Sequence, residues 1–93
     1  MSDADLLTAL KVDLGITSAG YDSRLQQLLT TAMAEVTAEG VDDLDTGSSF
    51  ADAQLVIMYA RWLWAKRETM EAMPRMLRWA LNNRVFGPKA AVT

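Results

Sequence analysis

The sequence predicts an all-α fold: a small four-helix domain with a long central hydrophobic helix and an irregular C-terminal tail. Three observations support this prediction. Hydrophobic residues make up 51% of the 93 residues, enough for the core of one domain spanning residues 1–93. Apolar residues recur at helical spacing between Leu6 and Val36. No glycine or proline interrupts the chain from Phe50 to Met73.

The first helix is predicted over residues 3–14. Ser2 and Asp5 have the spacing of a capping box, in which each side chain accepts a hydrogen bond from the other residue's backbone N–H. Leucines at positions 6, 7, 10 and 14 form an apolar stripe behind that cap. Gly15 follows the last of them and is a natural helix stop.

The second helix is predicted over residues 22–39, with Asp22 as its N-cap and Gly40 as its stop. Its apolar positions repeat every three or four residues and form a full amphipathic stripe. They are Leu25, Leu28, Leu29, Ala32, Met33 and Val36.

Residues 41–49 show no periodicity and contain several turn formers, so they are predicted to be a loop. The loop includes an Asp-Thr-Gly triplet at 45–47, which carries a catalytic aspartate in aspartic proteases. Those enzymes place the triplet on a β loop and need a second aspartate that shares its proton. Here helices are predicted on both sides, so we interpret Asp45 and Gly47 as turn residues.

The third helix is predicted over residues 50–72, with Ser49 and Asp52 as a second capping box. Gln54, Arg61 and Glu68 form one narrow polar stripe, and apolar side chains fill most of the remaining circumference. A helix of this kind must be surrounded by other elements. We therefore expect the other helices to pack around it.

The fourth helix is predicted over residues 74–83, because proline suits the first turn of a helix and Pro74 opens this one. Residues 84–93 are expected to form the irregular tail, closed off by Gly87 and Pro88.

Composition excludes several kinds of site. The chain has no cysteine and no histidine, which removes thiolate and imidazole metal ligands and the commonest general base. No P-loop, dinucleotide fingerprint or serine nucleophile motif is present. We therefore expect no enzymatic activity, no cofactor and no metal. The acidic N-terminus is unlike a signal peptide, and the longest apolar run contains Arg61, so no membrane association is expected.

Charge is divided unevenly along the chain. Residues 1–52 carry ten acidic and two basic residues, a net charge of −8. Residues 53–93 carry two acidic and seven basic residues, a net charge of +5. Helix-dipole preference and chance could produce such a division. It also suits a protomer that stacks head to tail, since heterologous contacts of this kind generate rings or filaments.

The last predicted helix has an outer side that combines arginine with tryptophan. Arg75, Arg78, Trp79 and Asn82 lie opposite its apolar stripe, and a tryptophan beside arginines is typical of interface hot spots. The alternative is that Trp79 lies beneath the C-terminal tail with Phe86. As candidate interface residues we take the basic and aromatic group with the loop acids. These are Arg75, Arg78, Trp79, Asn82, Arg84, Phe86, Asp42, Asp43 and Asp45.

A small helical DNA-binding module, such as a packaging-initiation protein, is the alternative function. The basic half supplies the charges for it, but the chain is acidic overall, with a pI of about 4.7. Ten acidic residues in the first half would oppose the non-specific attraction to phosphates.

The order of motifs resembles the head–tail connector proteins of tailed bacteriophages, also labelled head-completion or DNA-packaging adaptors. The motifs are "LLTALKVDLGI", "YDSRLQQLLTTAMAEV" and Gly40, then a loop, "AQLVIMYARWLWAKRE" and "MPRMLRWALNNRVF". The likeness covers most of the chain, and the last motif is its most specific part.

This resemblance implies a non-enzymatic subunit that is made in the bacterial host cytoplasm and located at the head–tail junction of the virion. It implies a ring under the portal protein that extends the DNA channel and docks a downstream tail-side protein. Double-stranded DNA would pass through without specific recognition, and the free subunit can be a monomer. A net charge of −3 suits such a conduit, because an acidic lumen lets DNA slide.

Overall fold

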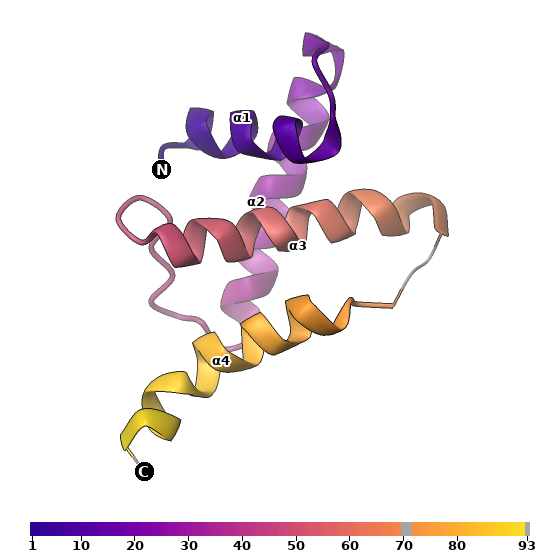
Figure 1. Ribbon diagram of the computed structural model, residues 1–93. Helices are drawn as coiled ribbons and strands as arrows, with labels where there is room; N and C mark the ends of the chain where they lie inside the picture. The colour runs from indigo at the N-terminus through magenta and orange to yellow at the C-terminus, as the bar shows by residue number, and fades with distance from the viewer. Residues whose placement is uncertain (70–71, 93) are drawn as a thin grey trace.

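The computed structural model confirms the all-α prediction. It describes residues 1–69 and 72–92, with side chains for residues 1–66 and 72–86. The elements are α1 (Asp3–Leu14), a 3-10 turn η1 (Ala19–Tyr21), α2 (Asp22–Ala38), α3 (Phe50–Thr69) and α4 (Arg75–Val92) (Figure 1). The described ranges contain no β-strand. Within them no helix is both long enough and apolar enough to cross a membrane.

Helix α3 is the centre of the fold, as the sequence predicted. It contacts α1, α2 and α4, and α1 and α4 lie on opposite sides of it (Figure 1). Helix α2 crosses behind this layer of three helices. Because α3 has neighbours on several sides, its buried residues are spread over most of its circumference. They are Asp52, Ala53, Leu55, Val56, Ile57, Tyr59, Ala60 and Leu63.

The core is completed by the apolar faces of the other helices. Helix α1 contributes Leu6 and Leu10, and α4 contributes Leu77 and Leu81. Most of the stripe predicted for α2 is buried as well, at Leu25, Leu28, Leu29, Ala32 and Val36, while Met33 is half-buried against it. Helices α1 and α2 thus bury most of the stripe that their sequence spacing indicates, with Leu7 and Leu14 half-buried at its edge. On α4 the spacing also predicts Met76 in the apolar face, but Met76 is exposed.

The ends of α1 follow the local sequence signals. The Ser2 side chain accepts a hydrogen bond from the Asp5 backbone N–H, and the Asp5 side chain accepts one from Ser2, which confirms the capping box. Gly15 adopts the left-handed conformation with φ of 70°, and the Ile16 N–H donates to the Lys11 carbonyl at 2.9 Å. These bonds satisfy backbone groups that the helix ends leave unpaired.

The start of α2 differs from the prediction. Tyr21, not Asp22, is its N-cap residue and makes no side-chain capping bond. The preceding 3-10 turn is capped instead, because the Ser18 hydroxyl accepts a hydrogen bond from the Gly20 N–H at 3.0 Å. The Asp22 carboxylate pairs with Lys11 Nζ at 2.7 Å, which joins the end of α1 to the start of α2.

The irregular C-terminal tail is also a wrong prediction. Helix α4 does not end near Asn83 but continues to Val92, so Gly87 and Pro88 lie within its bounds. Two side chains immediately after Asn83 are held by the rest of the molecule. Arg84 pairs with acidic residues of α3 and the preceding loop, and Val85 packs against the core beside Gly40. These non-local contacts support the helix beyond the point where its sequence signal weakens.

Gly40 joins α2 to the loop with a backbone conformation that would strain any other residue. Its φ is +122°, and a Cβ atom built there would lie 3.1 Å from Val85 Cγ1. Such a φ strains any L-residue, typically by about 1 to 3 kcal/mol. We therefore predict that Gly40→Ala lowers the melting temperature by several degrees, measured by circular dichroism, because α4 must also shift away from the new methyl group.

Gly47→Ala is the matched control. A Cβ there would meet only Asp45 Oδ1, at 3.5 Å, an ordinary contact, and Gly47 has no positive φ. Equal melting temperatures for the two variants would show that Gly40 does not constrain the approach of α4.

Candidate interaction surface on helix α4

Helix α4 presents two distinct faces. Leu77 and Leu81 on its inner face are 2% and 1% exposed. On its outer face Met76, Trp79 and Phe86 are 67%, 63% and 56% exposed. Arg75, Asn82 and Asn83 are exposed around them. We call the set Arg75, Met76, Trp79, Asn82, Asn83 and Phe86 the α4 outer face.

The structure decides between the two placements considered for Trp79. Its ring is not covered by the C-terminal segment, because both Trp79 and Phe86 are mostly exposed. Trp79 borders a shallow, largely apolar depression of about 450 Å³ between α3 and α4, together with Leu55, Met58 and Ala80. Met76 borders a second depression of about 400 Å³ that shares Met58. The outer face therefore continues toward α3 as apolar surface.

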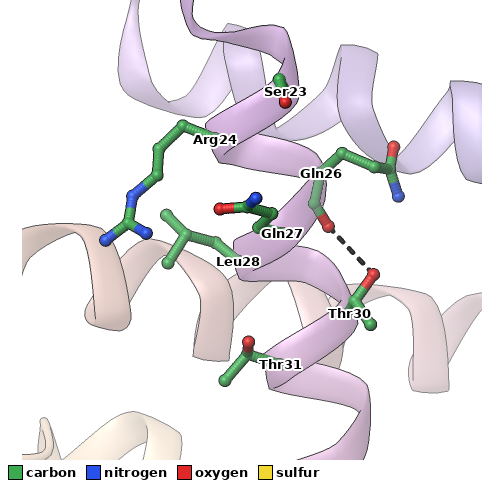
Figure 2. A pocket seen from close by; sticks show the side chains of 7 residues that line it. All are labelled: Ser23, Arg24, Gln26, Gln27, Leu28, Thr30 and Thr31. Atoms are coloured by element: carbon green, nitrogen blue, oxygen red, sulfur yellow. Dashed lines mark hydrogen bonds between the residues drawn. The ribbon is translucent and has the colours of Figure 1, made fainter.

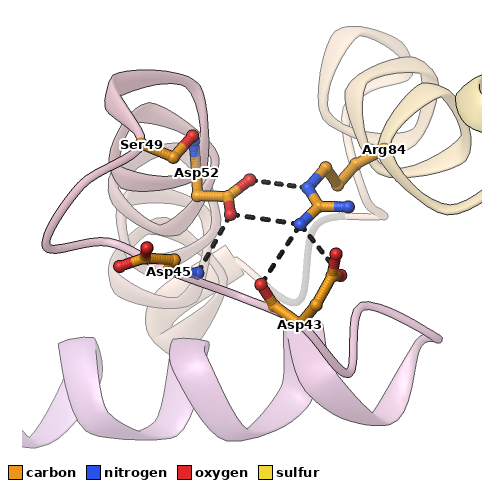
Figure 3. A network of polar contacts seen from close by, with 5 residues as sticks. All are labelled: Asp43, Asp45, Ser49, Asp52 and Arg84. Carbon is orange, nitrogen blue, oxygen red and sulfur yellow. Dashed lines mark hydrogen bonds and ion pairs between the residues drawn. The ribbon is translucent and has the colours of Figure 1, made fainter.

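Arg84 has a different role from the other candidates, because its half-buried guanidinium bonds acidic residues of the same chain. Its Nε donates to Asp52 Oδ1 at 2.6 Å and its Nη2 donates to Asp52 Oδ2 at 3.2 Å (Figure 3). The same Nη2 atom is 2.9 Å from Asp43 Oδ1. Asp52 is only 3% exposed, so its charge would be costly to bury without this partner.

These contacts shift both titrations in the direction that favours the ion pair. The Arg84 hydrogen bond holds the pKa of Asp52 below its ordinary value of 3.8, against the opposing effect of burial. A hydrogen bond from the Asp45 backbone N–H lowers that pKa further. Asp52 and Asp43 in turn raise the pKa of Arg84. Both groups are therefore charged at neutral pH.

Asp45 has the turn role that the sequence indicated. Its Oδ1 accepts a hydrogen bond from the Ser48 N–H at 3.1 Å, and its carbonyl accepts one from the Ser49 N–H at 2.9 Å. The capping box predicted at the start of α3 is only half formed. Ser49 Oγ accepts from the Asp52 N–H, but the Asp52 carboxylate binds Arg84 and Asp45 instead of reaching back to Ser49.

Arg78 also pairs within the chain. Its Nη1 lies 3.2 Å from Glu39 Oε2 at the end of α2, and both side chains are substantially exposed. Nearby, burial and a hydrogen bond with Glu35 raise the pKa of Tyr59 to about 12. Exposed pairs such as Arg78–Glu39 contribute about 0 to 1 kcal/mol, so Arg78 remains able to exchange partners.

The candidate residues therefore divide into two groups. The structure brings Arg84 together with Asp43 in the same chain and leaves Arg75, Trp79, Asn82 and Phe86 on the outer face. Asp42 and Asp45 are exposed on the loop. Sequence reasoning missed Asp52 as the partner of Arg84. The sequence did contain a signal for this pair. Asp52 lies between Ala51 and Ala53 at the start of the predicted central helix, and a charge that is buried there needs a partner.

No other region of the described chain gathers chemical groups into a site. A surface depression of about 580 Å³ runs along the outer side of α2 and is open (Figure 2). Its polar side chains, from Ser23 to Thr31, follow the helix and do not converge on a point. Among the described residues no group of three acidic side chains could hold a metal ion.

We predict that Asp52→Asn lowers the free energy of unfolding by about 2 to 3 kcal/mol at pH 7, measured by urea denaturation. Because the folded-state pKa of Asp52 lies below its unfolded value, its carboxylate stabilises the fold above about pH 4. That contribution is lost as the pH falls through the folded pKa. The difference between wild type and Asp52→Asn should therefore shrink in acid.

Asp43→Asn is the matched control, because the Asp43 side chain is 74% exposed and bonds the same guanidinium. We expect a loss of about 0 to 1 kcal/mol. A larger loss for Asp43→Asn than for Asp52→Asn would contradict the central role of the buried carboxylate.

No family model matches the chain, and neither do any curated protein or solved structure. The arrangement of its apolar and charged side chains is therefore the basis for assigning a function.

Proposed function

We propose that this chain is a structural adaptor of a tailed bacteriophage, a ring-forming subunit that docks under the portal, extends the DNA channel and joins head to tail. The α4 outer face is the observation that carries this proposal. It exposes a tryptophan, a phenylalanine and a methionine beside an arginine, and large exposed apolar side chains gathered on one helix face are typical of a protein interface. The resemblance of the sequence to head–tail connectors gives this interface its context.

The state of the basic residues favours protein partners over DNA. Lys11, Arg78 and Arg84 each pair with a carboxylate of the same chain. These pairs reduce the positive charge available to phosphates, and affinity for DNA depends on the number of phosphates neutralised. DNA would pass such a ring without being held, consistent with a net charge of −3.

The acidic residues of the loop support a structural role over a catalytic one. Asp45 accepts hydrogen bonds from the loop backbone, and Asp43 and Asp52 pair with Arg84. A general acid–base pair needs a carboxyl group whose pKa is raised toward neutrality, whereas the pKa of Asp52 is lowered. We therefore propose no enzymatic activity.

Removal of the gene tests this function. A nonsense mutation should leave capsids that fill with DNA and tails that assemble, but electron microscopy should find the two unjoined. Supplying the protein from a plasmid should restore joined particles. Joined, infectious particles without the protein would contradict the proposal, and capsids that fail to fill with DNA would favour the packaging alternative.

A gel shift separates the adaptor from the DNA-binding module directly. At physiological salt we expect no retardation of double-stranded DNA, because Lys11, Arg78 and Arg84 already pair with carboxylates and the net charge of the chain is −3. The same assay at low salt shows whether any residual binding is purely electrostatic. A shift that persists at physiological salt would support the DNA-binding module instead.

A further inference from the structure

We propose that the α4 outer face of one copy packs against the outer side of α1 in the next copy. This contact would close the proposed ring. Only its role in a phage particle rests on the proposed function. The α1 outer side consists of Ala4, Asp5, Thr8 and Val12, all exposed. Val12, 75% exposed, is the most exposed large hydrophobic residue described.

The α4 outer face has the spacing of a helix-packing seam. Met76, Trp79, Asn83 and Phe86 follow one another at intervals of three, four and three residues. This is the a/d repeat by which one helix packs against another. All four side chains are exposed, so the seam has no partner within the described chain. Asn83 is a polar residue at an a-type position, which commonly fixes the register of such a contact.

Charge decides which helix can occupy the seam. Arg75 is the basic residue of the α4 outer face, and α4 has no acidic residue, so pairing α4 with α4 of a second copy would give Arg75 no partner of opposite charge. Helix α1 has the opposite composition, with Asp3, Asp5 and Asp13. Its one basic residue, Lys11, already pairs with Asp22. The charges on α1 therefore complement Arg75 on the α4 outer face.

The side-chain sizes and the lengths of the two surfaces also match. The α1 outer side presents small side chains, Ala4 and Thr8, against which the large rings of α4 can approach closely. From residue 4 to residue 12 the helix rises about 12 Å, and from 76 to 86 it rises about 15 Å. The two surfaces therefore cover matching lengths.

The positions of the two helices make this contact head to tail. Helices α1 and α4 lie on opposite sides of α3 (Figure 1), so a copy that uses its α4 still exposes its α1. Because the two surfaces in the contact are different, each further copy can add in the same sense. A repeated contact of this heterologous kind closes into a ring when the rotation between copies permits.

Each single contact should be weak. Four residues on one side and a similar number on the other fall well short of the roughly 20 to 30 residues per partner of stable complexes. Free subunits would therefore associate transiently, and a ring would gain stability from many such contacts. Covalent trapping is the appropriate test, because it records a transient contact that a mass measurement would miss.

The natural absence of cysteine makes disulfide trapping specific. Thr8→Cys on α1 and Asn83→Cys on α4 replace exposed residues, so neither should disturb the core. Mixed under mild oxidation at low salt, the two variants should form a disulfide-linked dimer on a non-reducing gel. A chain carrying both substitutions should give a ladder of oligomers or a closed ring.

The controls use α2, on the side shown in Figure 2. Thr31→Cys also replaces an exposed threonine and, mixed with Asn83→Cys, should give severalfold less dimer than Thr8→Cys does. Equal yields from Thr31 and Thr8 would overturn the proposal. So would dimers of Asn83→Cys alone at the yield of the mixture, because they would show α4 packing against α4.

A charge reversal tests the electrostatic argument in the same assay. Arg75→Glu should reduce the trapped Thr8–Asn83 dimer severalfold, whereas Arg24→Glu, the same change at an exposed position on α2, should not. An equal loss from both would mean that net charge, and not this contact, governs the yield. The assay needs no portal or DNA, so failure of this contact and failure of the adaptor function are separable. If the nonsense mutant gives unjoined particles but no dimer is trapped, the adaptor function is supported and this interface is refuted.

Discussion

The ion pair between buried Asp52 and half-buried Arg84 joins α4 to the start of α3 and to the loop before it, 32 residues away in the sequence. Both oxygens of the Asp52 carboxylate accept hydrogen bonds from Arg84, and Oδ2 also accepts one from the Asp45 N–H in the loop. Because an unpaired carboxylate is so costly to bury, α4 must lie where Arg84 reaches this group. Five residues along an α-helix correspond to a rotation of about 140°, so an inward Arg84 directs Trp79 outward.

This constraint separates the charged residues by role. Arg84 and Asp52 act within the fold, whereas Arg75 is exposed at the edge of the molecule beside three large apolar side chains. A domain of 93 residues has few apolar residues to spare from its core. A tryptophan, a phenylalanine and a methionine are nevertheless exposed on one helix face, which is why we propose that a partner covers them.

Features that depend on neighbouring residues were predictable from the sequence. The capping box at Ser2, the stop at Gly15 and the central position of α3 follow from local spacing and from the width of an apolar face. The exposure of Trp79 followed in the same way from its angle on the helix. The length of α4 did not, because Arg84 is held by a residue 32 positions away. Spacing alone also could not show whether Arg84 and Asp43 pair within one chain or between two, and the structure places that pair within one chain.

The most direct test of this account is amide hydrogen exchange along α4 in wild type and Arg84→Met. Methionine keeps much of the side chain's bulk but leaves Asp52 without its ion-pair partner. If the pair fixes α4, the amides around Leu77 and Leu81 should lose protection while those of α1 and the first half of α2 keep it. If α4 retains its wild-type protection in Arg84→Met, the apolar contacts alone position the helix, and the ion pair is not the constraint on which the outer face depends.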